Sequence, residues 1–308
     1  MNIKQARYIK TIAECGTVTA AAKQLYVSQP SLSQMLHQVE DELGLPIFDR
    51  SVSPFRLTYA GEKYVQAADR ILAANAQLEM QIRELKHENS GRIRLGVSIS
   101  RALQILPKVF PMFLAQYPDV QIELTECGSA GLEELLISGQ IDMALAAIDP
   151  VGRNISYELI ERETVGILAG RGSKLAQRLS SGTPIALTDA KGDNFVSLTR
   201  DHSARLIQDK LFRKYDFNPR ILLETNSMDL CRRVTLETNA CMIMPSVYLD
   251  NYVAFKQGEF FPLADYENTR HFYACFRKGD FVPKYSRDFV QMVGAVLETH
   301  PSPTSLER

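Results

Sequence analysis

The stretch from Thr17 to Leu43 constrains this 308-residue chain most, because it predicts two short helices joined by a tight turn. The side chains of the alanines at positions 20–22 are small, so a second helix can cross the first helix closely. Ser28 then stands where an N-cap belongs, and Pro30 follows in the first turn, where no N–H is needed. The apolar residues of the second helix recur at steps of four, three and four, which predicts one buried stripe. They are Leu32, Leu36, Val39 and Leu43.

The opposite face of the second helix carries amides and hydroxyls, with no acidic residue in its first turns. Such a face suits a helix in the major groove of DNA, because Gln can bond adenine and Ser can bond base edges or phosphate. An ordinary helical hairpin with a solvated polar face is the alternative that these residues leave open. The candidate DNA-contacting residues here are Thr19, Gln29, Pro30, Ser31, Ser33, Gln34 and His37.

The segment after Gly44 favours the DNA-binding interpretation. Two short apolar runs flank a Ser/Pro tip, with Arg50 and Arg56 beside it, as expected for a two-stranded wing that places cations against the DNA. The formal net charge of the chain is only −1, and residues 1–58 hold six cations against five acids. Binding must therefore rest on a local surface, and we expect dimerisation to double the contacts.

With these residues in place, the N-terminal region resembles the winged helix-turn-helix of LysR-type transcriptional regulators. The residues that carry the resemblance are Ala21, Ala22, Leu25, the run 28–31, Ser33, Leu36, Val39, Glu40, Leu43, Gly44, Ile47, Phe48, Arg50, Leu57, Thr58, Ala60 and Gly61. The wing tip departs from the family, because Ser53 and Pro54 stand where basic residues are frequent. The resemblance implies a dimeric or tetrameric DNA-binding regulator, and RNA polymerase is a further candidate partner.

A long helix is expected after the wing, from about Tyr59 to His87, with no Gly or Pro after Gly61. Its apolar positions alternate steps of four and three, the 3.5-residue repeat of a coiled-coil seam, and Asn75 within the seam would fix its register. Packing of this helix on its own chain is the alternative; the family's linker helix dimerises, which supports the seam by resemblance. The candidate dimerisation residues are Tyr64, Ala68, Ile71, Asn75, Leu78, Ile82 and Leu85.

From Arg92 onward, short apolar runs alternate with helices, which predicts mostly parallel sheets with helices on both faces. The alternation occurs twice, and the chain then returns to the first unit, so we expect two lobes with a hinged cleft like that of periplasmic binding proteins. The family's effector domain has this architecture, although Thr238 and Ala240 replace two glycines that are usual there. The predicted fold is α+β and multidomain. Its parts are a winged helix-turn-helix (1–58), a linker helix (59–90) and an effector domain (91–308), with lobe I at 91–163 and 267–308 and lobe II at 164–266.

The cleft candidates follow from the rule that ligands bind at the carboxyl ends of the strands in such sheets. Hydroxyls and free N–H groups at helix starts, with two nearby arginines, favour a small anionic effector. For any single Ser or Thr, an ordinary helix cap is the alternative. The candidate effector-binding residues are Ser98, Ser100, Arg101, Gly128, Ser129, Thr199, Arg200, His202, Met244 and Pro245.

Other function classes find little support in the sequence. It contains no dinucleotide fingerprint, P-loop, nucleophile elbow or H-E-x-x-H motif, so we expect neither an enzyme nor a cofactor. The five cysteines are scattered, which favours buried reduced thiols over a redox sensor and predicts no metal site. Without a signal peptide or a membrane span, the protein is expected in the cytoplasm. A small-molecule binding protein whose N-terminal region makes protein contacts is the rival to a regulator of a dyad-symmetric operator.

Overall fold

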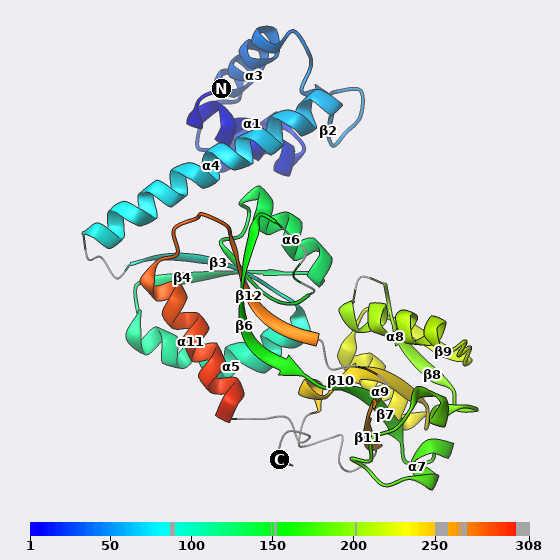
Figure 1. Cartoon of the computed structure of the whole chain (residues 1–308). Helices are drawn as coiled ribbons and strands as arrows, with labels where there is room; N and C mark the ends of the chain where they lie inside the picture. The colour runs from blue at the N-terminus through cyan, green and yellow to red at the C-terminus, as the bar shows by residue number, and fades with distance from the viewer. Residues whose placement is uncertain are drawn as a thin grey trace. The chain divides into compact units, whose positions relative to one another are not determined.

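The computed structural model describes residues 1–86, 90–148, 150, 153–200, 202–249, 258–264, 266 and 270–299. Its Cα positions divide into two compact units, which are treated separately below. Unit 1 holds residues 1–88 with the stretch 137–140, and unit 2 holds residues 89–136 and 141–308. Figure 1 traces both units along the chain, from blue at the N-terminus to red near the C-terminus.

Unit 1 begins with the predicted helix-turn-helix. Tyr26 has φ of 55° and turns the chain between the two helices, and Ser28 accepts the N–H of Ser31 as the expected N-cap. A two-stranded wing and a long helix follow, as expected. The elements are α1 (Ile3–Cys15), α2 (Val18–Gln24), α3 (Gln29–Leu43), β1 (Phe48–Asp49), β2 (Arg56–Leu57) and α4 (Tyr59–Leu85).

The core of unit 1 is built where the sequence places apolar residues at helical spacing. Leu32, Leu36 and Val39 of α3 are buried against Ala21 and Ala22 of α2, whose small side chains permit the close crossing. At the other side of α1, the Lys10 ammonium lies 2.5 Å from the Asp69 carboxylate of α4. Helix α1 is thus packed against both the helix-turn-helix and the first turns of α4.

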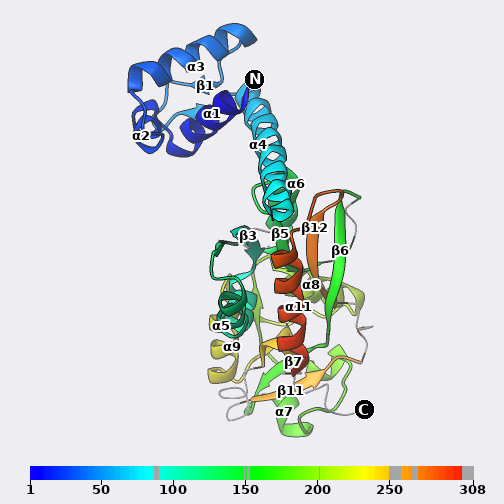
Figure 2. The ribbon, with the colours of Figure 1, turned by 90° about the vertical axis from the view of Figure 1, so that its left-hand side faces the viewer.

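Lobe I of unit 2 is a five-stranded sheet with the order β4-β3-β5-β12-β6. Helices α5 and α11 pack on one face of this sheet, and α6 packs on the other. Figure 2 shows α5 and α11 running along the same side. The elements are β3 (Gly91–Val97), α5 (Ile99–Gln116), β4 (Val120–Glu126), α6 (Ser129–Ser138), β5 (Met143–Ala147), β6 (Ile155–Glu163), β12 (Arg270–Arg277) and α11 (Lys284–Thr299).

Lobe II is a second five-stranded sheet with the order β11-β7-β10-β8-β9. Helix α9 packs on one face and α7 on the other. The first strand of the lobe, β7, lies next to its last strand, β11, which forms one edge of the sheet. The elements are β7 (Val165–Gly170), α7 (Lys174–Arg178), η1 (Leu187–Ala190), β8 (Phe195–Leu198), α8 (Ser203–Lys214), β9 (Ile221–Thr225), α9 (Met228–Glu237), β10 (Cys241–Pro245), η2 (Ser246–Tyr248) and β11 (Gly258–Pro262).

Both sheets are mixed, which corrects the expectation of mostly parallel sheets. In lobe I, β3 runs parallel to β4 and β5, but β12 runs antiparallel to β5 and β6. In lobe II, β7 runs antiparallel to both β10 and β11. Strands β6 and β7 lie where the chain passes from lobe I to lobe II, and β11 and β12 lie where it returns. The returning strand β12 runs opposite to its neighbours, because the chain re-enters the sheet from the other lobe. Within the described residues, no helix is long and apolar enough to cross a membrane.

Candidate functional site

The outer face of α3 in unit 1 is exposed along its first turns. Gln29, Pro30, Ser31, Gln34 and His37 are all exposed. Ser33 is half-buried, and Thr19 is exposed near the start of α2. The polar residues predicted to contact DNA therefore share one accessible surface with amide, hydroxyl and imidazole groups.

The wing is attached to α3 through Glu40. Its carboxylate accepts the main-chain N–H of Ile47 at 2.8 Å and pairs with the Arg50 guanidinium at 2.5 Å. Arg50 Nη1 also lies 3.4 Å from the His37 ring nitrogen. Arg56 is exposed on β2. Arg50 thus orients His37 and the wing start, whereas Arg56 is the wing cation left facing solvent.

The first predicted residues of the dimer seam are covered by their own chain. Tyr64 is buried in the core of unit 1, and Ala68 is buried where α4 packs on α1. The seam prediction is wrong at these two residues, because the sequence repeat cannot show which half of a long helix its own domain will cover. Beyond Ile71, α4 keeps large apolar side chains accessible.

Two large apolar residues stand out on that second half of α4. Leu78 is 55% exposed and Ile82 is 43% exposed, while Ile71 and Asn75 are half-buried. Asn75 donates a hydrogen bond at 2.9 Å to Glu79 of the same helix. The side chain of Leu85 lies outside the described residues. The exposed stripe agrees in position with the predicted 3.5-residue repeat.

A cleft lies between the lobes of unit 2, with about 450 Å³ of empty space that includes open solvent. Six predicted residues line it, namely Ser98, Ser100, Arg101, Gly128, Ser129 and His202. They share the cleft with residues that the sequence argument did not select, namely Leu145, Ala146, Ala147, Ala204, Met228, Tyr248, Arg270 and Phe272, and with Ser203 beside His202. The cleft is therefore polar at helix starts and apolar along strand and helix walls.

Four predicted residues lie elsewhere. Arg200 lines a separate surface depression with Asp209 and Arg213, and Thr199 is not among the residues lining the cleft. Met244 and Pro245 are buried in the lobe II sheet, because β10 ends there and the chain turns into η2. Tyr248, three residues further, takes the position at the cleft that the sequence argument gave to Met244.

A buried charge network forms the inner end of the cleft. The Arg101 side chain is 2% exposed and pairs with Glu161 at 2.9 Å and with the fully buried Glu163. It also donates to Gln104 at 2.7 Å and stacks over the Phe272 ring at 4.0 Å. Arg101 thus holds α5 against β6, while its guanidinium also lies 5.7 Å from the centre of the Tyr248 ring of lobe II and its Nε has no hydrogen-bond partner among the described residues.

Arg270, the first residue of β12, is the second cation of the network. It is 7% exposed and pairs with Glu163. Its Nη2 donates to the Ser203 hydroxyl of lobe II at 2.9 Å, while its Nε has no hydrogen-bond partner among the described residues. Burial lowers the pKa of Arg270 to about 9, and the charge of Arg101 contributes in the same direction. The guanidinium remains positively charged at pH 7.

Two further polar contacts join the lobes beside this network. Gln104 of α5 donates from Nε2 to the main-chain oxygen of Val247 at 2.8 Å. Tyr248 shares a side-chain hydrogen bond with Ser98, and burial raises the pKa of this tyrosine. Together with Arg270 and Ser203, these contacts connect α5 and the start of β12 to lobe II.

Two of the helices that begin at the cleft, α5 and α8, lack side-chain caps. Asn2, Thr17, Ser28, Ser173 and Ser227 each cap a helix by accepting a main-chain N–H. At α5 and α8, by contrast, neither the Ser98 nor the His202 side chain makes such a bond. The first N–H groups of a helix have no partner within it and carry partial positive charge, so these two ends can accept an anion.

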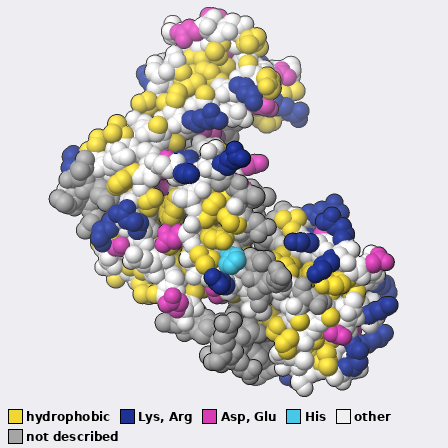
Figure 3. Space-filling model, viewed as in Figure 1, with side chains coloured by type: hydrophobic (Ala, Val, Ile, Leu, Met, Phe, Trp, Pro, Cys, Tyr) yellow, Lys and Arg dark blue, Asp and Glu magenta, His cyan; other side chains and the backbone are white. Residues whose placement is uncertain are grey.

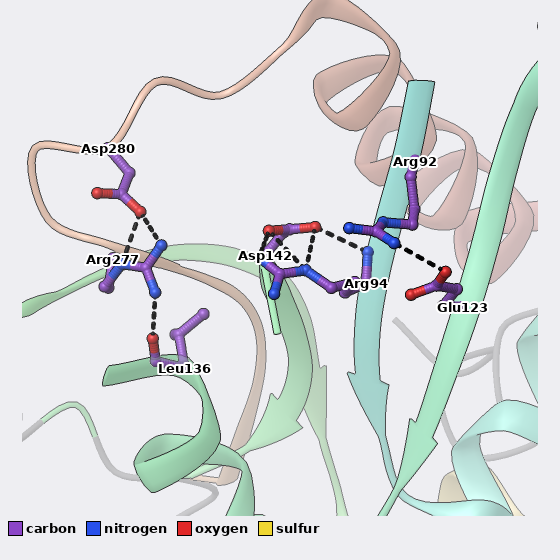
Figure 4. A network of polar contacts seen from close by, with 7 residues as sticks. All are labelled: Arg92, Arg94, Glu123, Leu136, Asp142, Arg277 and Asp280. Carbon is purple, nitrogen blue, oxygen red and sulfur yellow. Dashed lines mark hydrogen bonds and ion pairs between the residues drawn. The ribbon is translucent and has the colours of Figure 1, made fainter. Parts of the chain in front are cut away.

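A second polar network fixes α6, whose first residue lies at the cleft. Figure 4 shows Arg277 of β12 between Asp280 and the C-terminal end of α6, where its Nη1 donates to the main-chain oxygen of Leu136 at 2.9 Å. Beside it, the Arg94 main-chain N–H donates to the Asp142 carboxylate at 2.9 Å. Ser129 at the opposite end of α6 is thereby held in position.

The positions of most thiols agree with the buried, reduced cysteines that the sequence favours. Cys231, Cys241 and Cys275 are buried, and burial raises the pKa of Cys231 and of Cys275 to about 12. Burial raises the pKa of the half-buried Cys127 as well. Among the described residues, no group of three or more His, Cys, Asp or Glu side chains is arranged to hold a metal ion.

A winged helix-turn-helix and a two-lobed domain with a polar cleft, in one chain, are the architecture of a DNA-binding regulator with a ligand-binding domain. Comparison with known families agrees. Residues 3–62 match the bacterial regulatory helix-turn-helix domain of the LysR family, and residues 86–298 match the LysR substrate binding domain. The chain belongs to the LysR family of transcriptional regulators.

Individual relatives span the full chain. The Hca operon transcriptional activator HcaR of Escherichia coli is 29% identical over 95% of this chain and 97% of its own length. The structure of full-length OxyR from Pseudomonas aeruginosa matches with a TM-score of 0.71 at 21% identity, covering 97% and 95% of the two chains. Full-length CbnR in complex with its target DNA matches with a TM-score of 0.65 at 22% identity, covering 96% and 100%. These likenesses to solved structures show the fold.

Proposed function

We propose that this regulator binds DNA sequence-specifically as a dimer or a dimer of dimers, with α3 in the major groove. The observation that carries the proposal is the exposed face of α3, where Gln29, Ser31 and Gln34 present hydrogen-bonding groups without a neighbouring acid in the first turns. Each of these groups can bond to a base edge or a phosphate. Gln29 and Ser31 lie at the N-terminal end, the part of a recognition helix that reaches the bases.

Because cations and acids nearly balance in unit 1, the proposal requires two or more copies of the chain on the DNA. Figure 3 shows Lys, Arg, Asp and Glu side chains interspersed on the visible face of this unit, in keeping with its near balance of charge. A single copy therefore gains little from counterion release on DNA. The exposed Leu78 and Ile82 on α4 supply the apolar stripe for pairing two chains, which places two copies of α3 on one duplex.

The two-lobed domain supplies the regulated part of the proposal. A small anionic effector bound in the cleft contacts both lobes, since Ser98, Ser129 and His202 belong to different helix starts around it. An effector alters DNA binding only if it binds two arrangements of the chain with unequal affinity. The interlobe contacts of Gln104 and Arg270 are groups whose pairing can differ between such arrangements. Like the regulators it resembles, the chain is proposed to act without catalysis.

The test is selection of DNA from a pool of random duplexes by the full-length protein. A dimeric reader recovers an inverted repeat whose half-sites lie about one or more helical turns apart. A matched selection with Gln34→Ala, which removes one exposed amide of α3, shifts the recovered base preferences if α3 reads the sequence. Folded, dimeric protein that enriches no motif would contradict DNA reading and favour a ligand-binding protein whose N-terminal region makes protein contacts.

A further inference from the structure

We propose that His37 reads a hydrogen-bond acceptor on a base edge through its Nδ1–H, and that Arg50 of the wing fixes this tautomer. The proposal rests on the placement of α3 in the major groove given above and names what one position of that helix reads. Its starting point is an imidazole whose two nitrogens have different surroundings. Among the described residues, the ring makes one polar contact, the 3.4 Å approach of Arg50 Nη1 to Nε2, and Nδ1 has no partner.

Arg50 is held in place by a group other than His37. Its Nη2 lies 2.5 Å from the Glu40 carboxylate, whose side chain is 11% exposed. The same carboxylate accepts the main-chain N–H of Ile47 at 2.8 Å, so it is itself fixed by the turn after α3. His37 and Glu40 are three residues apart on α3 and therefore lie on one face of the helix. The guanidinium is thus positioned beside the His37 ring before any DNA is bound.

The position of Arg50 decides which nitrogen of the ring carries the proton. A guanidinium has N–H donors and no acceptor, whereas a neutral imidazole has one N–H and one bare nitrogen. The tautomer is set by the hydrogen bond that one of the two nitrogens makes. Nε2 faces the guanidinium and is therefore the bare, accepting nitrogen, because an N–H there would point at another N–H. The proton lies on Nδ1, and His37 presents a donor to its surroundings.

This donor lies on the face of α3 that is proposed to contact bases. His37 is exposed and follows Ser33 by four residues and Gln34 by three, which places the three side chains on one face. In the major groove, guanine presents the acceptors N7 and O6, whereas cytosine presents an amino donor. A ring that can only donate, with a cation behind it, matches guanine best and cytosine least. His37 should therefore select guanine over cytosine at one position of each half-site.

The wing then contributes to sequence preference without touching that base. Arg50 is a positioning residue that acts through His37, and Glu40 positions Arg50 in turn. When Arg50 is absent, either nitrogen of the ring can carry the proton, so the ring can present a donor or an acceptor. Discrimination at the position read by His37 should therefore fall, while the preferences read by Gln29 and Gln34 stay the same.

The experiment begins with selection of random duplexes by the full-length wild type and by His37→Ala. The position whose base preference differs between the two is the one that His37 reads. Fluorescence anisotropy then measures affinity for all four bases at that position, and for 7-deazaguanine and 2-aminopurine, which lack the N7 and the O6 acceptor of guanine respectively. His37→Asn places an amide N–H where Nδ1 lies, and His37→Gln places its amide where Nε2 lies.

The positioning role is tested with Arg50→Ala and with a matched control in the wing. Arg56→Ala is the control, because Arg56 is an exposed wing cation on the other strand. Thermal melts verify folding, and Arg50→Lys, which keeps a charge opposite Glu40, serves if Arg50→Ala does not fold. Nitrogen NMR of full-length protein with 15N-labelled histidine, at about pH 8, reports the tautomer directly. The chain has five histidines, so the signals lost in His37→Asn are those of His37.

The expected result is that the wild type prefers guanine over cytosine by about tenfold at this position, the size of one hydrogen bond to a base. At least one of the two guanine analogues loses most of that preference, and neither analogue matters to His37→Ala. His37→Asn retains the preference and His37→Gln does not. Arg50→Ala lowers the preference, whereas Arg56→Ala weakens binding to all four bases alike. The spectrum shows a protonated Nδ1 and a bare Nε2 in the wild type and a mixture of tautomers in the Arg50 variant.

Three results would overturn the proposal. They are an inverted repeat in which no position responds to His37→Ala, retention of the preference by His37→Gln but not by His37→Asn, and a proton on Nε2 in the wild type. Each of these leaves DNA reading by α3 intact, because the wild type still enriches a motif. A wild type that enriches no motif contradicts the proposed function itself, and the two failures are thereby distinguished.

Discussion

The Arg50 guanidinium lies 2.5 Å from the Glu40 carboxylate, which joins the wing, just after β1, to α3. The same carboxylate accepts the Ile47 N–H at 2.8 Å, so one side chain fixes both the turn after α3 and the start of the wing. The Glu40 side chain is largely buried, and a lost partner there leaves an unsatisfied N–H. Glu40 therefore adds polar contacts to the apolar packing of Ile47 and Phe48 that places the wing against α3.

Replacing Glu40 by Ala tests this coupling. We expect Glu40→Ala to lower the free energy of unfolding of unit 1 by about 1–3 kcal/mol, because it leaves the Ile47 N–H and the Arg50 charge unpaired. Urea denaturation followed by circular dichroism measures the change. The control is Asp41→Ala, which removes an exposed acid from the same helix. Equal stability of the two variants would show that Glu40 does not hold the wing.

Gln29 and Arg56 should affect DNA binding in different ways. Gln29→Ala removes a group proposed to read a base, so it should reduce discrimination at one position by about 1–3 kcal/mol. Arg56→Ala removes an exposed wing cation and should weaken binding to all sequences alike, with a smaller dependence on salt. Fluorescence anisotropy with the selected site and with single-base variants of it separates the two effects. If Gln29→Ala lowers the affinity for every sequence equally, Gln29 contacts the DNA backbone instead of a base.

The exposed stripe on α4 should carry the pairing of chains. The double substitution Leu78→Asp and Ile82→Asp places charge on that stripe and should convert the dimer into monomers, with the secondary structure retained. Sedimentation equilibrium gives the mass directly. Gln66→Asp is the matched control, since Gln66 is exposed on the same helix but lies off the stripe. A double variant that sediments like the wild type would place the dimer contact elsewhere.

Thiol reactivity reports whether the cysteines are structural. At pH 8, Cys231 and Cys275 should resist iodoacetamide in the folded protein, because burial raises the pKa of each to about 12 and the reactive thiolate is scarce four units below that value. Cys15, which is half-buried, should react first. Mass spectrometry of peptides after timed alkylation shows the order. Rapid modification of Cys231 without unfolding would contradict its buried position.

The elements defined by short-range patterns could be predicted from the sequence. The helix-turn-helix needs only the small alanines of α2, the cap at Ser28 and the apolar stripe of α3, all within 27 residues. Ser98, Ser100 and Ser129 at the cleft were found for a similar reason, since they lie at the starts of α5 and α6. Local spacing contains enough information in both cases.

The residues that the sequence argument missed depend on pairing across the chain. Glu163 and Arg270 meet because β6 pairs with β12, strands more than 100 residues apart. No local pattern marks that pairing, and the only available signal was a charged residue at the start of an otherwise apolar strand, Arg270 in RHFYACFR. Tyr64 and Met244 were misplaced for a related reason, because packing of distant elements decides which face of a helix or strand end is covered.

The number of chains on one operator tests the central claim most directly. Full-length protein is mixed with a duplex of about 40 base pairs that carries the selected site, and the mass of the complex is measured by sedimentation at low protein excess. The account predicts two or four chains per duplex and loss of the complex when one half-site is scrambled. A stable complex with one chain, unaffected by scrambling a half-site, would contradict symmetric recognition by paired copies of α3.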